Sequence, residues 1–536
     1  MLSFHLAINL IALGLFLFFA RRAWIRPRPL PPGPKGWPII GNIFDIPKEK
    51  VHIAYMEMAH KYGSDLLYLN MAGTSMLILN SVEATNDLFV GRSTLYSDRP
   101  RFPMICELMG WDYNFGFIPY GTRWRKSRAL FIQLFSPSNL KTYEKPLMQE
   151  SVHVFLNRLL DTPKEFEDHM RFLSGGNIIS SVYGIVANDF HHPHIELTKK
   201  ALHEFSQAAI PGSYLVDALP MLKNIPGWLP GARFKREAAE KRKTVEEMIK
   251  QPLEFVKRNM ASGTTKSCIA SRALQEMQED GSWSEDKEHL LGNVLGTIYA
   301  AGADTTSTAT STIFLALVCN PDILKKGQAA VDAVVGHDRL PDVVDEGKIP
   351  YVDAIVMEGL RWRPVIPLGI AHHTASADIY KGYHIPADTI VMGNTWAILH
   401  DPATYGEDVD QFRPERFLNP DGTLNRTIPY PDAAFGYGRR ICPGRVFAHS
   451  AVWLTVASLL ACFDLSKVSD KDGVAIEPST DSVDGFFSYV FLLLLCEYIL
   501  DVLLIIANHF RYPRPYECNI TPRSKSIEKM IRQSVS

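Results

Sequence analysis

A single cysteine in a glycine-framed loop near the C-terminal end constrains this chain more than any other feature. The loop reads Phe435-Gly-Tyr-Gly438-Arg-Arg440-Ile-Cys442-Pro-Gly444. Glycines at 438 and 444 let the backbone turn tightly and point amide N–H groups at the sulfur. The long side chain and planar fork of Arg440 suit a carboxylate partner. The loop therefore predicts a thiolate ligand for the iron of a heme, an arrangement that favours O–O cleavage.

The environment of the sulfur decides whether it ionises. Burial alone raises the pKa of a thiol, so nearby dipoles and cations must oppose it. The apolar segment from Val446 to Phe463 predicts a helix whose positive N-terminal end faces Cys442. Phe435 is expected to pack against the porphyrin and shield the sulfur. The alternative is a buried structural cysteine, because free cysteines are often buried, but the complete F-x-x-G-x-R-x-C-x-G pattern favours a heme ligand.

Three further motifs precede the loop. They are Ala301-Gly-Ala-Asp304-Thr305-Thr306, Glu358-Gly-Leu-Arg361 and Phe412-Arg-Pro-Glu-Arg416-Phe417. In this order, the four motifs resemble the cytochrome P450 family over roughly residues 30–488 and 512–524, and in particular fungal secondary-metabolism members similar to O-methylsterigmatocystin oxidoreductase. The resemblance implies a mainly α-helical heme-thiolate fold with small β-sheets, holding heme b.

Asp304 and Thr305 are the predicted catalytic residues. Gly302, just before them, costs a helix about 1 kcal/mol relative to alanine, and this weak point could open a groove where oxygen fits. There the Thr305 hydroxyl could donate a hydrogen bond while Asp304 relays protons from solvent. The alternative is a local cap or kink, because Ser, Thr and Asp side chains hydrogen-bond the neighbouring backbone.

Two other groups of side chains are assigned through the resemblance. Glu358 and Arg361 lie three residues apart on one helical face and can pair directly; the resemblance implies that this pair is buried, structural and completed by Arg416. Trp124 and Arg128 share a helical face at i and i+4. The resemblance implies these heme-propionate partners: Trp124, Arg128, His372 and Arg440, with Arg99 as a weaker candidate. His373 competes with His372, and a lone surface histidine is the alternative.

Composition excludes several classes of protein. A net charge of −2 over 536 residues argues against a nucleic-acid binder. Seven scattered cysteines show no paired spacing, which argues against a disulfide framework or a structural zinc site and fits a reducing compartment. Apolar segments predict the walls of a pocket for a hydrophobic small molecule. They are 102–117, 208–219, 298–300, 365–368 and 485–487.

The first 20 residues are predicted to be a membrane anchor. The 17 positions from Phe4 to Ala20 are apolar except for His5 and Asn9, and arginines follow at 21, 22, 26 and 28. The positive-inside bias then places the rest of the chain in the cytosol, giving a single-pass endoplasmic reticulum protein. A cleaved signal peptide is the alternative, but its charges should precede the apolar run. Residues 21–36 form a basic, proline-rich hinge, 37–524 the catalytic domain and 525–536 a polar tail.

Residues 489–511 interrupt the expected ending of the family. Joining Ser488 to Tyr512 restores an ordinary Gly-aromatic turn followed by Pro-Arg-Pro-Tyr, and the 23 residues between them correspond to 69 nucleotides in frame. We interpret the segment as a translated, unspliced intron. A second membrane segment is the alternative, although Glu497 and Asp501 are costly in a bilayer. A major cDNA that retains these nucleotides would exclude the intron.

The resemblance implies a monooxygenase that inserts one atom of O₂ into a hydrophobic small molecule. Because the chain lacks a Gly-x-Gly-x-x-Gly fingerprint, electrons should come from NADPH through a separate cytochrome P450 reductase, with cytochrome b5 as a further partner. Two alternatives remain open: a heme-thiolate peroxide isomerase or dehydratase, which needs no proton relay, and a catalytically impaired heme-binding protein.

Overall fold

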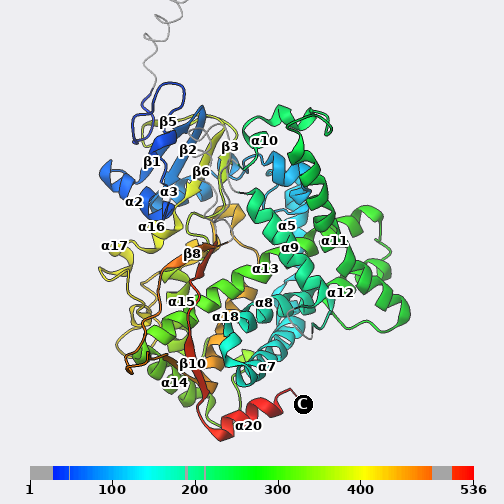
Figure 1. Cartoon of the computed structure of the whole chain (residues 1–536), viewed down its shortest axis with the longest axis vertical. Helices are drawn as coiled ribbons and strands as arrows, with labels where there is room; N and C mark the ends of the chain where they lie inside the picture. Colours follow the sequence, from blue (N-terminus) through cyan, green and yellow to red (C-terminus); the bar gives the residue numbers. More distant parts are fainter. Residues whose placement is uncertain (1–27, 48, 188–190, 210–212, 486–509, 536) are drawn as a thin grey trace, which may run out of the picture.

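Helices make up most of the molecule, and a small sheet lies at one end (Figure 1). The structure, a computed structural model, describes residues 28–47, 49–187, 191–209, 213–485 and 510–535. Its longer helices are α2 (Val51–Lys61), α5 (Thr122–Leu134), α7 (Lys145–Asp161), α8 (Phe166–Tyr183), α9 (Pro193–Ala208), α11 (Arg233–Ser262), α12 (Ile269–Glu279), α13 (Glu285–Cys319), α14 (Pro321–Val335), α15 (Pro350–Trp362), α18 (Arg445–Cys462) and α20 (Lys525–Gln533). The prediction of a mainly α-helical fold is confirmed.

Helix α13 runs through the middle of the molecule (Figure 1) and is 35 residues long. Its start is set by Ser284, whose side chain accepts a hydrogen bond from the Lys287 N–H, and by acidic residues in the first turn. Side chains from Leu291 to Ala300 are all buried, as expected for a helix surrounded by others. The long apolar-rich run from 287 to 319, with few helix breakers, accounts for a helix of this length.

A four-stranded sheet forms the other structural unit. Its order is β1 (Leu66–Met71), β2 (Thr74–Leu79), β6 (Thr389–Gly393) and β3 (His372–Thr374). The β2–β6 pair is parallel and the others are antiparallel. Smaller sheets pair β4 (Asp378–Tyr380) with β5 (Tyr383–Ile385), β7 (Phe463–Lys467) with β10 (Cys518–Pro522), and β8 (Ser482–Gly485) with β9 (Phe510–Pro513).

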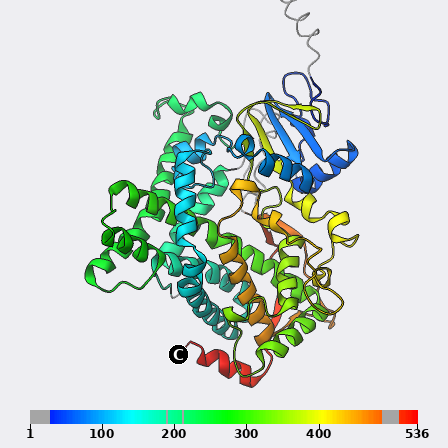
Figure 2. The same ribbon diagram turned by 180° about the vertical axis from the view of Figure 1, so that it is seen from behind.

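Helix α18 packs beside α13 and forms the second half of the central core, as the view from behind shows (Figure 2). It confirms the helix predicted after Cys442. Among the described residues α18 alone is long and apolar enough to cross a membrane, but most of it is buried inside the domain. Core packing therefore explains its composition. The predicted anchor at 1–20 lies outside the described residues.

Short helical turns connect these elements. They are α3 (Val82–Thr85), α4 (Ser93–Tyr96), α6 (Pro137–Asn139), α10 (Leu215–Ala218), α16 (Thr395–Leu399), α17 (Pro402–Tyr405), η1 (Ile43–Asp45), η2 (Asn86–Gly91), η3 (Pro103–Leu108), η4 (Trp111–Tyr113), η5 (Leu140–Glu144), η6 (Pro163–Glu165), η7 (Pro220–Asn224), η8 (Val343–Asp345), η9 (Pro414–Phe417), η10 (Asp432–Phe435) and η11 (Gly438–Arg440). Turns η10 and η11 place the cysteine loop against the helical core.

Most of the predicted polar tail at 525–536 forms a helix. Residues Lys525–Gln533 form α20, and its two isoleucines, Ile527 and Ile531, are buried. Spaced four residues apart, they share one helical face. The Ile531 carbonyl accepts a hydrogen bond from Asn157 of α7. The tail is thus a packed element of the domain. Of the segment read as an intron, residues 489–509 lie outside the described residues.

A buried ion cluster joins α15 to η9. Arg361 donates two hydrogen bonds to Glu358, at 2.7 and 2.8 Å, and the pair is fully buried. The Arg416 Nε lies 3.0 and 3.1 Å from the two Glu358 oxygens, and the Arg413 N–H donates to the same carboxylate. Asp408 accepts from Arg416 and adds the second negative charge. Glu358 and Arg361 thus form the buried pair expected from the sequence, and Arg416 contacts the same carboxylate.

We predict that Glu358→Ala lowers the free energy of unfolding by about 3–5 kcal/mol, because it leaves two buried guanidinium groups without their carboxylate. Urea unfolding followed by circular dichroism measures the change. The matched control is Lys50→Ala, which removes an exposed 3.2 Å ion pair with Asp481 and should cost about 0–1 kcal/mol. Equal midpoints for the two variants would contradict a structural role for the cluster.

Candidate active site

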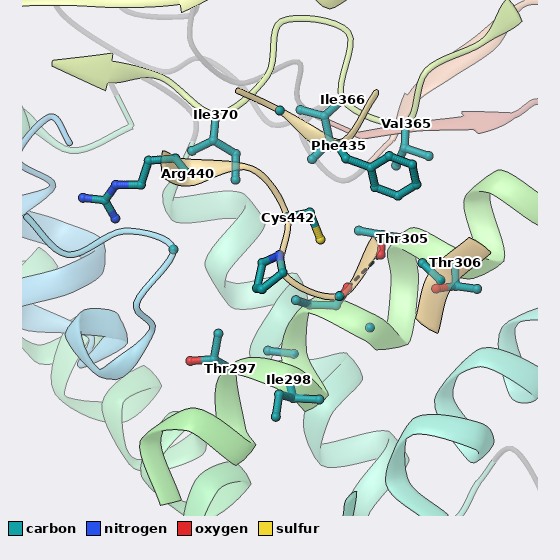
Figure 3. Close-up of a pocket in the computed structure, with 18 of the residues that line it drawn as sticks. Thr297, Ile298, Thr305, Thr306, Val365, Ile366, Ile370, Phe435, Arg440 and Cys442 are labelled. Carbon is teal, nitrogen blue, oxygen red and sulfur yellow. Dashed lines mark hydrogen bonds between the residues drawn. The ribbon is translucent and has the colours of Figure 1, made fainter. Parts of the chain in front are cut away.

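One large cavity lies between α13 and the cysteine loop. Its volume is about 340 Å³, and its walls are mostly apolar. Figure 3 shows the sulfur of Cys442 directed toward the part of α13 that carries Thr305. Phe435, Val365 and Ile366 line the same space from the loop and from the segment after α15. The cavity thus brings together the two sequence motifs assigned to oxygen chemistry.

The cysteine loop is built around close backbone contacts. The Cys442 N–H donates to the Phe435 carbonyl at 2.8 Å and closes the loop. Gly438 has a φ of +52°, and a Cβ there would lie 2.1 Å from the Phe89 carbonyl oxygen. The prediction of a tight turn is therefore confirmed for Gly438. Gly444, the residue before α18, has a φ of −87°, which any residue can adopt. Its contribution is the backbone N–H, which hydrogen-bonds Cys442.

Opposing influences act on the thiol. Burial raises the pKa of Cys442, whereas the Gly444 N–H and the positive charges of Arg128 and Arg445 lower it. Helix α18 begins at Arg445, so the positive end of its dipole lies beside the sulfur. These groups favour the thiolate, and a coordinated metal ion deprotonates a thiol outright. The donor set therefore suits a sulfur that ligates iron.

The Asp304–Thr305 pair lines the cavity from an unbroken helix. The Thr305 hydroxyl donates to the Ala301 carbonyl at 2.8 Å, the dashed line in Figure 3. Gly302 does not interrupt α13; instead, a Cβ at Gly302 would lie 3.0 Å from Ile178 of α8. Gly302 lines the cavity together with Ala301, Asp304 and Thr305. Glycine allows two helices to pack closely there.

Four cationic or hydrogen-bonding side chains meet at one edge of the cavity. Arg440 donates to the carbonyls of Ser97, Phe115 and Ile118, and Arg128 donates to the Ile441 carbonyl. Both guanidinium groups lie over the Trp124 ring, at 4.8 and 5.5 Å. Arg99 donates to the carbonyls of Gly116, Ile370 and Ala371. Arg99, the weaker candidate, therefore lies within the same buried cluster.

The position of His372 resolves the choice between two neighbouring histidines. Successive strand residues face opposite sides, and His372 lines the cavity while His373 lies 3.6 Å from Asp388. The Nδ1 atom of His372 lies 2.7 Å from the Tyr96 carbonyl. Burial and the charge of Arg99 hold the pKa of His372 well below its usual value, and an anion in the cavity would raise it.

This cluster fits the carboxylates of a heme. Arg99, Arg128 and Arg440 are bonded through main-chain carbonyls and form no ion pair with a carboxylate among the described residues. Burial and mutual repulsion lower their pKa values, that of Arg440 to about 10. Buried charges of one sign require an anion. Two propionates beside a single thiolate would supply the missing charge.

Several wall residues were not predicted from the sequence. The predicted segments contribute Phe117, Ile298 and Val365, but 208–219 contributes no described residue to the wall. Leu202 and Phe205 of α9 lie there instead, and Thr297, just before the predicted segment 298–300, adds a polar group; the polar Asn114 lies within the predicted segment 102–117. Leu202 and Phe205 are three apart on a helix, a spacing that signals a buried face without saying what it faces. Residues 486–487 lie outside the described residues.

Comparison with known proteins agrees with this geometry. The cytochrome P450 family model matches residues 31–484. Cytochrome P450 monooxygenase 208 from Postia placenta is 39% identical over 525 residues, covering 98% of this chain and 96% of the relative. Cytochrome P450 monooxygenase COX2 from Coprinopsis cinerea is 39% identical over 95% of this chain and 92% of its own length. Tryptamine 4-monooxygenase from Psilocybe cyanescens is 36% identical over 98% and 99%, respectively.

A half-buried cysteine, a cluster of arginines that form no ion pair within the described residues, and an apolar cavity define a heme-thiolate protein. With the family model covering most of its length and relatives of this similarity, the chain belongs to the cytochrome P450 family. It is a monooxygenase of the type found in fungi. Membership implies a heme cofactor and electrons delivered by a redox partner.

We predict that Arg440→Leu speeds heme loss by about 10- to 100-fold, because charge-assisted hydrogen bonds contribute about 1.5–3 kcal/mol each. Transfer of heme to an excess of apomyoglobin measures the rate. The control is Arg439→Leu, since the neighbouring Arg439 is exposed and donates to the Tyr120 hydroxyl. Circular dichroism checks the fold of both variants. Heme loss at the natural rate from Arg440→Leu would contradict the assigned role.

Proposed function

We propose that this monooxygenase inserts one oxygen atom of O₂ into a neutral, largely apolar organic molecule of secondary metabolism. The observation that carries the proposal is the apolar cavity shared by Cys442 and the Asp304–Thr305 pair. A metabolite of terpenoid, polyketide or aromatic type suits such walls. Relatives named for single pathways, including tryptamine 4-monooxygenase, support secondary metabolism as the setting.

Different residues that line this cavity would have separate roles in the reaction. Heme b, when bound, supplies the iron at which O₂ is reduced and activated. Cys442 would ligate the iron, while Trp124, Arg128, His372 and Arg440 would hold the propionates and Phe435 would shield the sulfur. The Thr305 hydroxyl, which here donates to the Ala301 carbonyl, would pass a proton from its Oγ1 into the cavity. The Asp304 carboxylate, one residue away on α13, would replenish that proton from solvent.

Electrons would come from NADPH through a separate cytochrome P450 reductase, with cytochrome b5 as a second donor. The surface nearest the cysteine loop carries basic side chains, which supports binding of an acidic partner protein. Exposed Arg123, Arg125 and Lys126 lie along α5, and Lys141 and Lys145 line a groove that reaches Gly444 of the loop. Basic side chains of this kind steer a negatively charged protein toward the face that carries them.

The protein would be anchored in the endoplasmic reticulum membrane with its catalytic domain in the cytosol. Several large apolar side chains are exposed at the end of the molecule that contains the four-stranded sheet, and they support contact of this end with a bilayer. Trp37 and Ile39 are exposed after the hinge, and Met221 and Trp228 are exposed near α10, which lies at the same end (Figure 1). Exposed tryptophans favour the membrane–water interface.

The two alternatives predict different reactions. A peroxide isomerase or dehydratase would need neither O₂ nor a reductase, and the Asp304–Thr305 pair on the cavity wall would serve no purpose in it. An impaired heme-binding protein would bind heme without turnover. NADPH oxidation that depends on the reductase and yields an oxygenated product favours the monooxygenase over both.

We predict that Thr305→Ala lowers the ratio of product formed to NADPH oxidised about tenfold or more, because a positioned proton donor contributes about 10²–10⁴-fold to a rate. NADPH oxidation continues, and the electrons leave as hydrogen peroxide. Product and peroxide are quantified together with a substrate found by spectral screening.

The matched control is Thr310→Val. Thr310 also lies on α13 and donates its hydroxyl to a helix carbonyl, but it does not line the cavity. An unchanged ratio in Thr305→Ala, or an equal fall in both variants, would contradict the proton-transfer role.

We predict that Asn425 carries no glycan. Asn425-Arg426-Thr427 is an acceptor sequence in a surface turn, with Arg426 and Thr427 exposed. A cytosolic domain never meets the glycosylation machinery of the lumen. Electrophoresis of microsomal protein before and after endoglycosidase treatment tests this, with an acceptor sequence fused before Met1 as the positive control. A glycan on Asn425 would overturn the proposed topology.

A further inference from the structure

Asn114 presents an amide group with a fixed orientation to the cavity. It follows η4, where its own N–H donates to the Trp111 carbonyl at 3.0 Å. Its Oδ1 accepts the Gly116 N–H at 2.8 Å. Because a main-chain N–H can only donate, the accepting atom must be the carbonyl oxygen of the carboxamide. The NH₂ group of Asn114 is thereby assigned and points away from Gly116.

The Asn114 NH₂ group has no acceptor within the described parts of the chain. The residue is 94% buried, with 6% of its surface exposed. Its Nδ2 nevertheless borders open space, unlike the indole nitrogen of Trp111, which is sealed inside the protein. Asn114 is one of the residues that line the cavity. A buried donor without a partner costs free energy, which a bound acceptor would recover.

The loop that carries Asn114 is held rigidly. Arg440 donates to the carbonyls of Phe115 and Ile118, and Arg99 donates to the carbonyl of Gly116. A Cβ at Gly116 would lie 2.9 Å from the Asn114 Oδ1, so glycine permits this tight turn. A donor held in place before a ligand arrives loses little conformational freedom on binding.

The neighbouring wall restricts the kind of molecule that could satisfy this donor. Phe117, Leu202 and Ile298 are apolar, and the Thr297 hydroxyl already donates to the Asn293 carbonyl at 2.8 Å. Among the described residues that line the cavity, Asp304 is the single carboxylate. The wall therefore offers a hydrogen-bond donor to a neutral ligand and, Asp304 apart, no counter-charge to a cationic one.

We propose that Asn114 is a specificity-determining residue that donates a hydrogen bond from Nδ2 to an oxygen of the substrate. The preferred substrates are neutral, largely apolar molecules with a carbonyl, ether or hydroxyl oxygen at a distance from the oxidised carbon. This assignment rests on the proposed monooxygenase function and adds a substrate class to it.

The experiment uses ligands that enter the cavity whatever the natural substrate is. The probes are 1-alkylimidazoles of increasing chain length. At each length two compounds are compared: one whose alkyl chain ends in a methyl ketone, and one with a plain hydrocarbon chain of equal length. Imidazole nitrogen binds heme iron, so dissociation constants follow from the shift of the Soret band of the holoenzyme. The ratio of ketone to hydrocarbon affinity isolates the contribution of the acceptor oxygen.

Two variants separate the donor from the turn that it supports. Asn114→Asp, measured at alkaline pH, keeps an acceptor for the Gly116 N–H but lacks the NH₂ group, and Asn114→Leu lacks both. At one chain length the natural enzyme should favour the ketone, and both variants should reduce that preference about tenfold. Thr297→Val, which removes a hydroxyl already bonded within α13, should retain the preference.

The outcomes distinguish this inference from the function on which it rests. A ketone preference that is absent at every chain length, or that persists in both Asn114 variants, overturns the role of Asn114 while leaving the heme site intact. A Soret band that responds to no imidazole overturns the heme site, and the inference with it. A preference lost only in Asn114→Leu assigns the effect to the turn and also overturns the donor role.

Discussion

Positive charge that forms no ion pair within the described residues is the constraint on which this active site depends, although the Asp98 carboxylate attracts Arg99 and Arg440. Arg99, Arg128 and Arg440 each satisfy their hydrogen bonds with main-chain carbonyls, and burial and mutual repulsion lower their pKa values. Such an arrangement is unfavourable until an anion arrives. The same guanidinium groups hold the loops that surround the cavity. Cofactor binding and the shape of the substrate pocket are therefore coupled through the same side chains.

The thiolate imposes a second demand on the fold. Apolar surroundings disfavour an ionised sulfur, so the chain places the N-terminus of α18, the Gly444 N–H and two arginines around Cys442. Helix α18 must in turn pack against α13, which carries Asp304 and Thr305. The two long helices thus set the distance between the iron ligand and the proton-transfer pair. The buried cluster at Glu358 joins α15 to the segment that precedes the loop.

Much of this arrangement could be predicted from the sequence because it is encoded locally. The cysteine loop, the Glu358–Arg361 pair and the two core helices each depend on short spacings or on apolar runs. The close contact between Gly302 and Ile178 of α8 could not be predicted, because local propensity describes only a weak point in the helix. The packing of the polar C-terminal tail could not be predicted either. Ile527 and Ile531 have the spacing of one helical face, but two apolar residues among nine largely polar ones are too few to predict a packed helix.

The walls of the cavity could not be predicted in the same way. Leu202 and Phe205 reach the cavity through tertiary packing that no local pattern encodes. Asn114 lies in a segment predicted as wall, 102–117, but the pattern there is apolar and does not reveal its polar role. The donor role inferred for Asn114 depends on which of its amide atoms faces the backbone, and only coordinates supply that. Sequence therefore indicates the chemistry of this enzyme, while the structure is needed to argue what it recognises.

The most direct test of the account is the difference spectrum of the dithionite-reduced, carbon monoxide-treated protein, recorded for the natural chain and for Cys442→Ala. The account predicts a long-wavelength Soret band in the natural protein and its loss in the variant, because the thiolate donates electron density to the iron. A band that survives the substitution, or no band in the natural chain and in a version lacking residues 489–511, would contradict it.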